Sequence, residues 1–111
     1  MRETAAVRSD GSVRRVDSED VHVRNYDARE THRLGVRAVG GGRTVERTYR
    51  VGPGATESER DALPPGEYDV EVELDGLRRW TGHCRVDEGP EHTVLIEVGN
   101  GLVSITEGVP R

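Results

Sequence analysis

The 111-residue sequence contains no lysine and no phenylalanine, and it has one cysteine, one methionine and one tryptophan. A single cysteine excludes an intramolecular disulfide framework. Hydrophobic residues make up 32% of the chain, and no apolar run approaches the ~18 residues of a membrane-spanning helix, so we expect no membrane span. The N-terminus lacks the apolar segment of a signal peptide, which predicts a cytoplasmic protein.

All sixteen basic residues are arginine, against twenty-one aspartate and glutamate residues, and the formal net charge is −5. Carboxylates retain water and hydrated cations where salt competes for solvent, and arginine keeps its charge without the apolar stem that lysine exposes. Molar salt also screens the self-repulsion of such a chain, because the Debye length falls to ~3 Å at 1 M. The composition therefore predicts a salt-adapted protein and disfavours nucleic-acid binding.

The stretch from Leu63 to Val86 predicts a β-hairpin, because apolar residues alternate with carboxylates after a Pro-Pro-Gly break. A two-residue loop would place Arg79 opposite Val72 on the apolar face. We therefore expect a three-residue loop, residues 75–77, which pairs Val72 with Trp80. On the outer face this register matches acids with bases: Glu73 with Arg79, Asp69 with His83, and Glu67 with Arg85.

Shorter alternating stretches predict further strands. They are Val21–Asn25, Thr31–Val39, Thr44–Val51 and His92–Val98. Asn100-Gly101 is the preferred pair for a two-residue type I′ turn, and it predicts Val98 opposite Val103. We interpret the triple glycine at 40–42 as a hairpin loop, because no Lys-Ser/Thr follows it as in a phosphate-binding loop.

Two segments leave alternatives open. Arg47 shares a face with Val45 and Tyr49, which indicates either a β-bulge or an arginine that reaches out at the rim of the sheet. Residues 56–61 predict a helical turn or an acidic connection that crosses between two sheets. With about seven strands and no long helix, the chain is predicted to be all-β, with residues 1–12 irregular or an edge strand, residues 13–107 the domain, and residues 108–111 a frayed tail.

The hairpin entry LPPGEYDVEVELDG (63–76), the following strand with Trp80 and Cys84, and the final VLIEVGNGLVSI (94–105) carry a family resemblance. Together they resemble the small immunoglobulin-like β-sandwich domains of halophilic archaea, which are similar in shape to carboxypeptidase regulatory-like and transthyretin-like domains. The resemblance implies a two-sheet immunoglobulin-like sandwich with Greek-key connections. It also implies an accessory module rather than a catalyst.

Cys84 and His92 are the pair that could point to a metal site, since they flank a turn as ligands of a copper loop do. Such a site also needs a second histidine at short spacing and usually an axial methionine, and Met1 is the only methionine. We therefore favour a buried structural cysteine beside Trp80 and expect no metal and no cofactor.

No nucleophile motif such as G-x-S-x-G occurs, so we expect a non-enzymatic protein with no catalytic residues. Arg33, Arg37 and Arg43 with Tyr49 form a basic patch, which is either a solvated face paired with carboxylates or a partner-binding surface. We predict a module that contacts a protein partner, or a second copy of itself, through a sheet edge or this arginine surface. The alternative is a small-ligand or metal-binding domain that uses Cys84 and His92.

Overall fold

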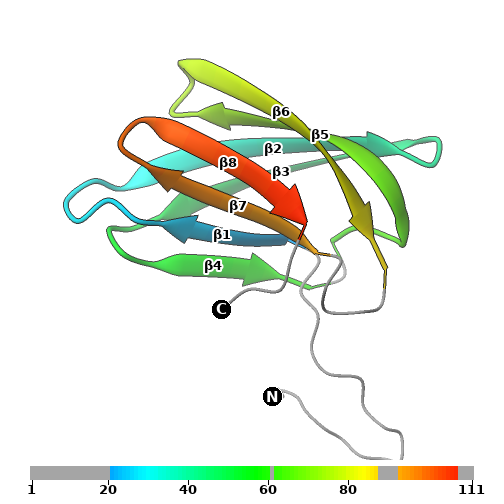
Figure 1. Cartoon of the computed structure of the whole chain (residues 1–111), viewed down its shortest axis with the longest axis horizontal. Helices are drawn as coiled ribbons and strands as arrows, with labels where there is room; N and C mark the ends of the chain where they lie inside the picture. Colours follow the sequence, from blue (N-terminus) through cyan, green and yellow to red (C-terminus); the bar gives the residue numbers. More distant parts are fainter. Residues whose placement is uncertain (1–20, 61, 88–92, 108–111) are drawn as a thin grey trace, which may run out of the picture.

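The computed structural model describes residues 21–60, 62–87 and 93–107, which form two four-stranded sheets packed face to face (Figure 1). The strands are β1 (Val21–Asn25), β2 (His32–Gly40), β3 (Arg43–Val51), β4 (Thr56–Glu59), β5 (Gly66–Leu74), β6 (Arg78–Val86), β7 (Val94–Gly99) and β8 (Leu102–Glu107). The sheets have the orders β4-β1-β7-β8 and β3-β2-β5-β6. These strands confirm the predicted all-β sandwich, and the described residues hold no helix that could cross a membrane.

The chain changes sheet four times, after β1, β3, β4 and β6. As a result β5 returns to pair with β2, and β7 pairs in parallel with β1. The segment at 56–61 was predicted to be a helical turn or a loop, and this prediction was wrong: β4 is an edge strand that pairs antiparallel with β1. Its polar sequence carries no strand signal, because it is held by backbone hydrogen bonds to β1, which every residue type except proline can make.

The predicted registers of both hairpins are confirmed. Val72 pairs with Trp80, and Val98 pairs with Val103. The two turns have positive φ angles at Asp75 (53°) and Gly76 (74°), and at Asn100 (54°) and Gly101 (77°), as type I′ geometry requires. The three acid–base pairs predicted for the outer face of β5 and β6 are also directly opposite one another.

Arg47 extends to the rim of the sheet, and the pairing of its strand, β3, with β2 is not interrupted by a bulge. The β2–β3 register runs continuously and pairs Arg47 with Val36, so there is no bulge. The guanidinium Nε donates to Oε2 of Glu59 on β4 at 2.9 Å. The rim alternative is therefore confirmed, and this ion pair spans the open side between the two sheets.

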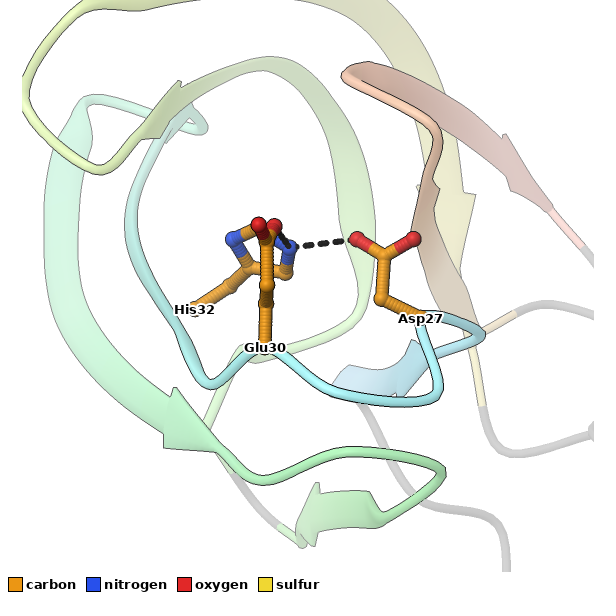
Figure 2. Close-up of side chains that lie close together, drawn as sticks. All are labelled: Asp27, Glu30 and His32. Carbon is orange, nitrogen blue, oxygen red and sulfur yellow. Dashed lines mark hydrogen bonds and ion pairs between the residues drawn. The ribbon is translucent and has the colours of Figure 1, made fainter.

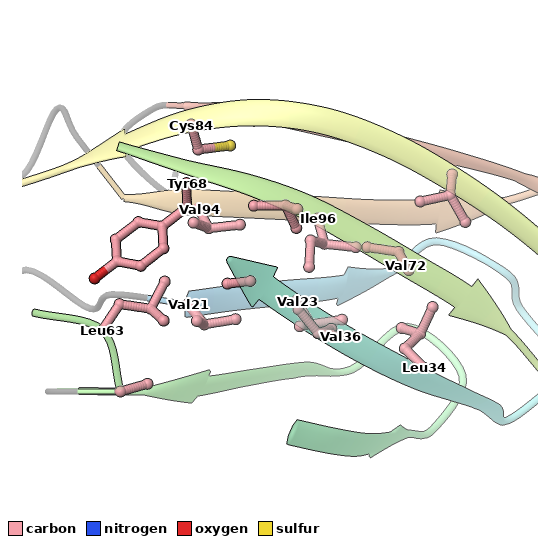
Figure 3. Close-up of a cluster of buried hydrophobic side chains, with 14 of the residues drawn as sticks. Val21, Val23, Leu34, Val36, Leu63, Tyr68, Val72, Cys84, Val94 and Ile96 are labelled. Carbon is pink, nitrogen blue, oxygen red and sulfur yellow. The ribbon is translucent and has the colours of Figure 1, made fainter. Parts of the chain in front are cut away.

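Valine, isoleucine, leucine and one tyrosine fill the space between the sheets (Figure 3). Tyr68 is the largest fully buried side chain, and its hydroxyl donates to the carbonyl oxygen of Pro64 at 2.5 Å. Each fully buried valine of this set contributes ~1.5–3 kcal/mol relative to an exposed one. The N-terminal and C-terminal segments predicted at 1–12 and 108–111 lie outside the described residues.

Four connections meet at one end of the sandwich: residues 26–31, 52–55, 75–77 and 100–101 (Figure 1). We call this the loop end. The β2–β3 turn lies at the opposite end (Figure 1).

Candidate functional site

His32 is the buried centre of the loop end, with 6% of its surface exposed. Its Nε2 lies 2.6 Å from Oδ2 of Asp27 in the β1–β2 loop, as Figure 2 shows, and its Nδ1 lies 2.7 Å from Oδ2 of Asp75 in the β5–β6 turn. Oε1 of Glu30 lies 3.6 Å from the same Nε2. One imidazole therefore joins the β1–β2 loop, which runs from one sheet to the other, to the β5–β6 turn, which connects two strands of the same sheet.

The hydrogen bonds of His32 define its protonation state. A carboxylate accepts hydrogen bonds, so both contacts are satisfied only when both ring nitrogens carry a proton, which is the imidazolium form. Burial alone would lower the pKa of His32, but the hydrogen bonds to Asp27 and Asp75 and the attraction of both carboxylates outweigh it, so the pKa is raised. The pKa of Asp27 is lowered, first by the hydrogen bond from the Asn100 amide and then by His32.

Asp75 binds His32 and β2 at the same time. Its Oδ1 accepts from the Arg33 amide at 2.8 Å, and its own amide donates to the Arg33 carbonyl at 2.8 Å. Burial would raise the pKa of Asp75, but the bonds from the Arg33 amide and His32 overcome this and lower it. The β5–β6 turn is thus attached to the start of β2 through both the side chain and the backbone amide of one residue.

Asn25 shapes the loop that presents Asp27. The Asn25 side chain is buried, and its Nδ2 donates to the carbonyl oxygens of Glu30 at 2.7 Å, Val51 at 3.0 Å and Gly52 at 3.0 Å. Its Oδ1 accepts from the Asp27 amide at 2.9 Å. Oδ1 of Asp27 in turn accepts from the Asn100 amide at 3.1 Å. These bonds connect three segments of the loop end, residues 26–31, 52–55 and 100–101, and the contact of His32 with Asp75 adds the fourth, residues 75–77.

Asp27, Glu30 and His32 each place one ligand atom within 4.8 Å of the others, a spacing that a divalent cation could use. A cation requires a neutral imidazole with a free lone pair on the ligating nitrogen. Both nitrogens of His32 are instead held by carboxylates at 2.6 and 2.7 Å. We therefore interpret the cluster as a carboxylate–imidazolium–carboxylate bridge.

The four residues of the predicted arginine surface do not share one face. Arg33 and Arg37 lie on the outer face of β2, where Nε of Arg37 lies 3.4 Å from Oε2 of Glu46. Tyr49 has the opposite orientation: it packs against the core, and its hydroxyl donates to Oε1 of Glu59 at 2.7 Å. Arg43 pairs with Gly40 at the far end of the sandwich. Of the arginines in this set, Arg33 is the one next to the loop end.

Cys84 lies in the core, with its thiol 3.7 Å from the carbonyl oxygen of Thr106. Burial, with a smaller effect of Glu107, raises the pKa of the Cys84 thiol to about 11. It is thus a protonated, packed side chain, as the favoured prediction had it. His92 lies outside the described residues, so the Cys84–His92 pair stays untested.

A hydrogen bond also joins Ser58 on β4 and His22 on β1, with 2.7 Å between Oγ and Nδ1. These residues are direct partners in the β1–β4 register. The pairing of the strands therefore accounts for their proximity without a catalytic role.

The exposed apolar side chains gather at the loop end. Tyr26 is 59% exposed, Leu77 84% and Leu102 63%. Tyr26 and Leu102 flank Gly99: Leu102 is its partner on β8, and the Tyr26 Cβ lies 3.3 Å from the position of a Cβ on Gly99. The fourth exposed large hydrophobic residue of the described chain, Val39, lies near the β2–β3 turn at the other end.

The sequence predicts Asn25 at the end of a strand and Asp75 in a hairpin loop, and it connects neither of them, nor Asp27, to His32. The four residues are as much as 50 positions apart along the chain. Their contact depends on the pairing of β2 with β5, which sets Leu34 opposite Leu74 and so brings the start of β2 to the β5–β6 turn. The repeated acidic and turn-forming residues elsewhere in the chain hide any local signal for this cluster.

Two facing sheets, a Greek-key path and a structured loop end define an immunoglobulin-like β-sandwich domain. The family profile described as a halobacterial Ig-like domain (Ig_halo) matches residues 29–111, and the chain belongs to this family. The match confirms the resemblance seen in the sequence and the prediction of a halophilic source. No curated protein and no solved structure matches the chain.

Proposed function

We propose that this domain is a non-enzymatic interaction module that binds a protein partner through its loop end. The observation that carries the proposal is the position of Tyr26, Leu77 and Leu102, three of the four exposed large hydrophobic residues of the described chain. Single exposed apolar residues are ordinary, but their concentration at one end of a domain with only 32% hydrophobic residues is not. Proteins present such side chains where a partner covers them.

The surface beneath these residues is held in place. The Tyr26 hydroxyl accepts from Nη1 of Arg24 at 3.1 Å and donates to Oε2 of Glu97 at 2.9 Å, so the ring has a defined position. The His32 bridge and the Asn25 bonds hold the connecting segments. A surface that is already ordered loses less conformational entropy on binding than a flexible one.

High salt favours this kind of contact over the arginine surface. At 1 M salt the Debye length of ~3 Å screens exposed ion pairs such as Arg37 with Glu46. Burial of apolar surface is not weakened in this way, and excluded salts strengthen it. Contacts made by exposed apolar side chains are therefore better suited than exposed ion pairs to binding between two proteins in molar salt. The cytoplasmic location expected from the sequence stays a prediction.

The test compares a triple variant with a matched control. Tyr26→Ser, Leu77→Ser and Leu102→Ser together remove the apolar side chains, and Val39→Ser makes the same kind of change at the opposite end. Each exposed substitution should change stability by less than ~0.5 kcal/mol, which thermal unfolding checks. Tagged wild type and both variants are incubated with a halophile extract in molar salt, and the bound proteins are quantified by mass spectrometry.

The proposal expects a protein that wild type and Val39→Ser retain equally and that the triple variant loses. Self-association of the wild type in light scattering, lost in the triple variant, would identify the partner as a second copy. Equal retention by all three proteins would refute the loop end as the contact surface. Failure of the wild type to retain any protein or to self-associate would refute the interaction role.

A further inference from the structure

We propose that the loop end contains a proton-operated clamp, in which protonated His32 holds Asp27 and Asp75 together and loss of its proton releases the β5–β6 turn. The geometry carries this inference, because an almost completely buried imidazole contacts a carboxylate at each nitrogen, at 2.6 and 2.7 Å. A neutral imidazole has one N–H donor and one lone pair. It can therefore satisfy only one of the two carboxylates.

The surroundings of His32 decide which contact is lost. Nε2 faces two carboxylates, Asp27 at 2.6 Å and Glu30 at 3.6 Å, whereas Nδ1 faces Asp75 alone. The remaining proton is more stable on the nitrogen that faces more negative charge. Deprotonation therefore leaves N–H at Nε2 and a lone pair at Nδ1, which repels the carboxylate of Asp75.

The other groups around His32 do not compensate for this repulsion. Its partner on β3, Val51, is apolar, and the Asn100 turn contributes only a backbone amide to Asp27. Arg33, the next residue on β2, already donates its amide to Asp75. Arg33 and Arg29 are the cations of this region, Arg29 lining the same surface depression as Asp27 and Glu30. Asp27, Asp75 and Glu30 are the charged groups that face the ring nitrogens, and these three carboxylates favour the imidazolium.

The sign of the pH dependence follows. The clamped form holds a proton that the released form gives up near the ordinary histidine pKa of ~6.5. Because the pKa of His32 is raised in the clamped form by its two carboxylates in spite of burial, clamping is complete below pH ~6.5 and is lost as pH rises through the raised value. Leu77 belongs to the turn that is released, so an effect on partner binding rests on the proposed function. The clamp itself is tested without a partner.

Asp75→Asn provides the decisive variant. An amide at this position keeps an acceptor for the Arg33 amide, tolerates the positive φ of 53°, and offers an N–H to the lone pair of a neutral His32. It should therefore hold the turn closed at alkaline pH. Asp69→Asn is the matched control, since it makes the same change beside His83, whose Nδ1 lies 3.0 Å from Asp69 on the exposed face.

Nuclear magnetic resonance of the full chain in molar salt gives both readouts. Imidazole nitrogen shifts report the titration and tautomer of His32, and hydrogen exchange of the Asp75 and Leu77 amides, corrected for intrinsic rates, reports the turn. From pH ~6.5 up to the pH at which His32 titrates in the folded protein, the protection factor of these amides should fall about tenfold per pH unit, because release of the turn is coupled to the loss of one proton. The protection factors of the β7 amides should not change. Asp69→Asn should behave as the wild type does, and Asp75→Asn should lose the pH dependence.

Several results would overturn the clamp. They are a His32 titration at or below the ordinary histidine value in the wild type, an Nδ1–H tautomer at high pH, or an unchanged pH profile in Asp75→Asn. Stoichiometric binding of Mn²⁺ or Zn²⁺ at the His32 resonances would assign the cluster to a metal instead. The wild-type tautomer alone decides the question if Asp75→Asn does not fold.

Discussion

Replacing Asn25 by aspartate should destabilise the domain more than any other change of one atom at the loop end. In the wild type, Nδ2 of Asn25 donates to three carbonyl oxygens between 2.7 and 3.0 Å away, those of Glu30, Val51 and Gly52. Asn25→Asp replaces this nitrogen with an oxygen and keeps the shape of the side chain. The two N–H donors of the amide are shared among the three carbonyl oxygens, so the change removes the equivalent of two hydrogen bonds, and each buried group left unsatisfied costs ~1–3 kcal/mol.

The expected loss is therefore about 2–6 kcal/mol at pH 7, against a total stability of ~5–15 kcal/mol for an ordinary domain. A 60–100-residue domain loses ~4–8 °C of melting temperature per kcal/mol, so the midpoint should fall by at least ~8 °C. The new carboxyl would be held protonated by its neighbours, with a folded-state pKa above the unfolded value of ~3.9. The loss should thus be smaller at pH 4 than at pH 7.

Urea unfolding at constant molar salt, followed by the fluorescence of Trp80, measures this loss. Asn100→Asp makes the same chemical change in an exposed type I′ turn, where aspartate is accepted, and should stay within ~1 kcal/mol of the wild type. A cost below ~1 kcal/mol for Asn25→Asp at pH 7 would refute the role given to the Asn25 amide.

Two further predictions concern the sheets. Gly40→Ala should lower the free energy of unfolding in urea by ~1–3 kcal/mol or more, because the new Cβ would lie 2.1 Å from the Glu67 carbonyl oxygen. Gly35→Ala should instead raise it by ~0.5–1 kcal/mol, because the new Cβ meets only the Glu73 Cβ, at 3.9 Å, and alanine suits a strand better than glycine. Equal effects of the two substitutions would contradict the close approach at Gly40. Burial raises the pKa of the Cys84 thiol to about 11, so the folded protein should resist iodoacetamide at pH 8 until urea unfolds it. Mass spectrometry measures the labelling, and rapid labelling of the folded protein would place Cys84 outside the core.

The hairpins were predictable because their signals are local. Alternation at Tyr68, Val70 and Val72 assigns side chains to two faces of one strand, and the positive φ angles that Asp75-Gly76 and Asn100-Gly101 accept fix the turns that join neighbouring strands. These effects operate over a few residues of chain. The loop length, register and inner face of each hairpin could therefore be read from the sequence without knowledge of the second sheet.

The sheet order and the site could not be read in this way. The polar strand β4 and the parallel pairing of β1 with β7 depend on backbone hydrogen bonds, which are nearly the same for every residue type and leave no pattern in the side chains. The orientation of Tyr49 followed from its strand, but the partner Glu59 came from another sheet.

By itself, then, the sequence determined the class of fold, the hairpin registers and the salt-adapted surface, since composition and short-range periodicity carry that information. Tertiary structure alone decided that Asp27 and Asp75, 48 positions apart, would face the two nitrogens of one buried histidine. It also decided that Tyr26, Leu77 and Leu102 would be exposed at one end. Both results come from the long-range pairing of strands, where the position of a side chain is set by distant parts of the chain rather than by its neighbours.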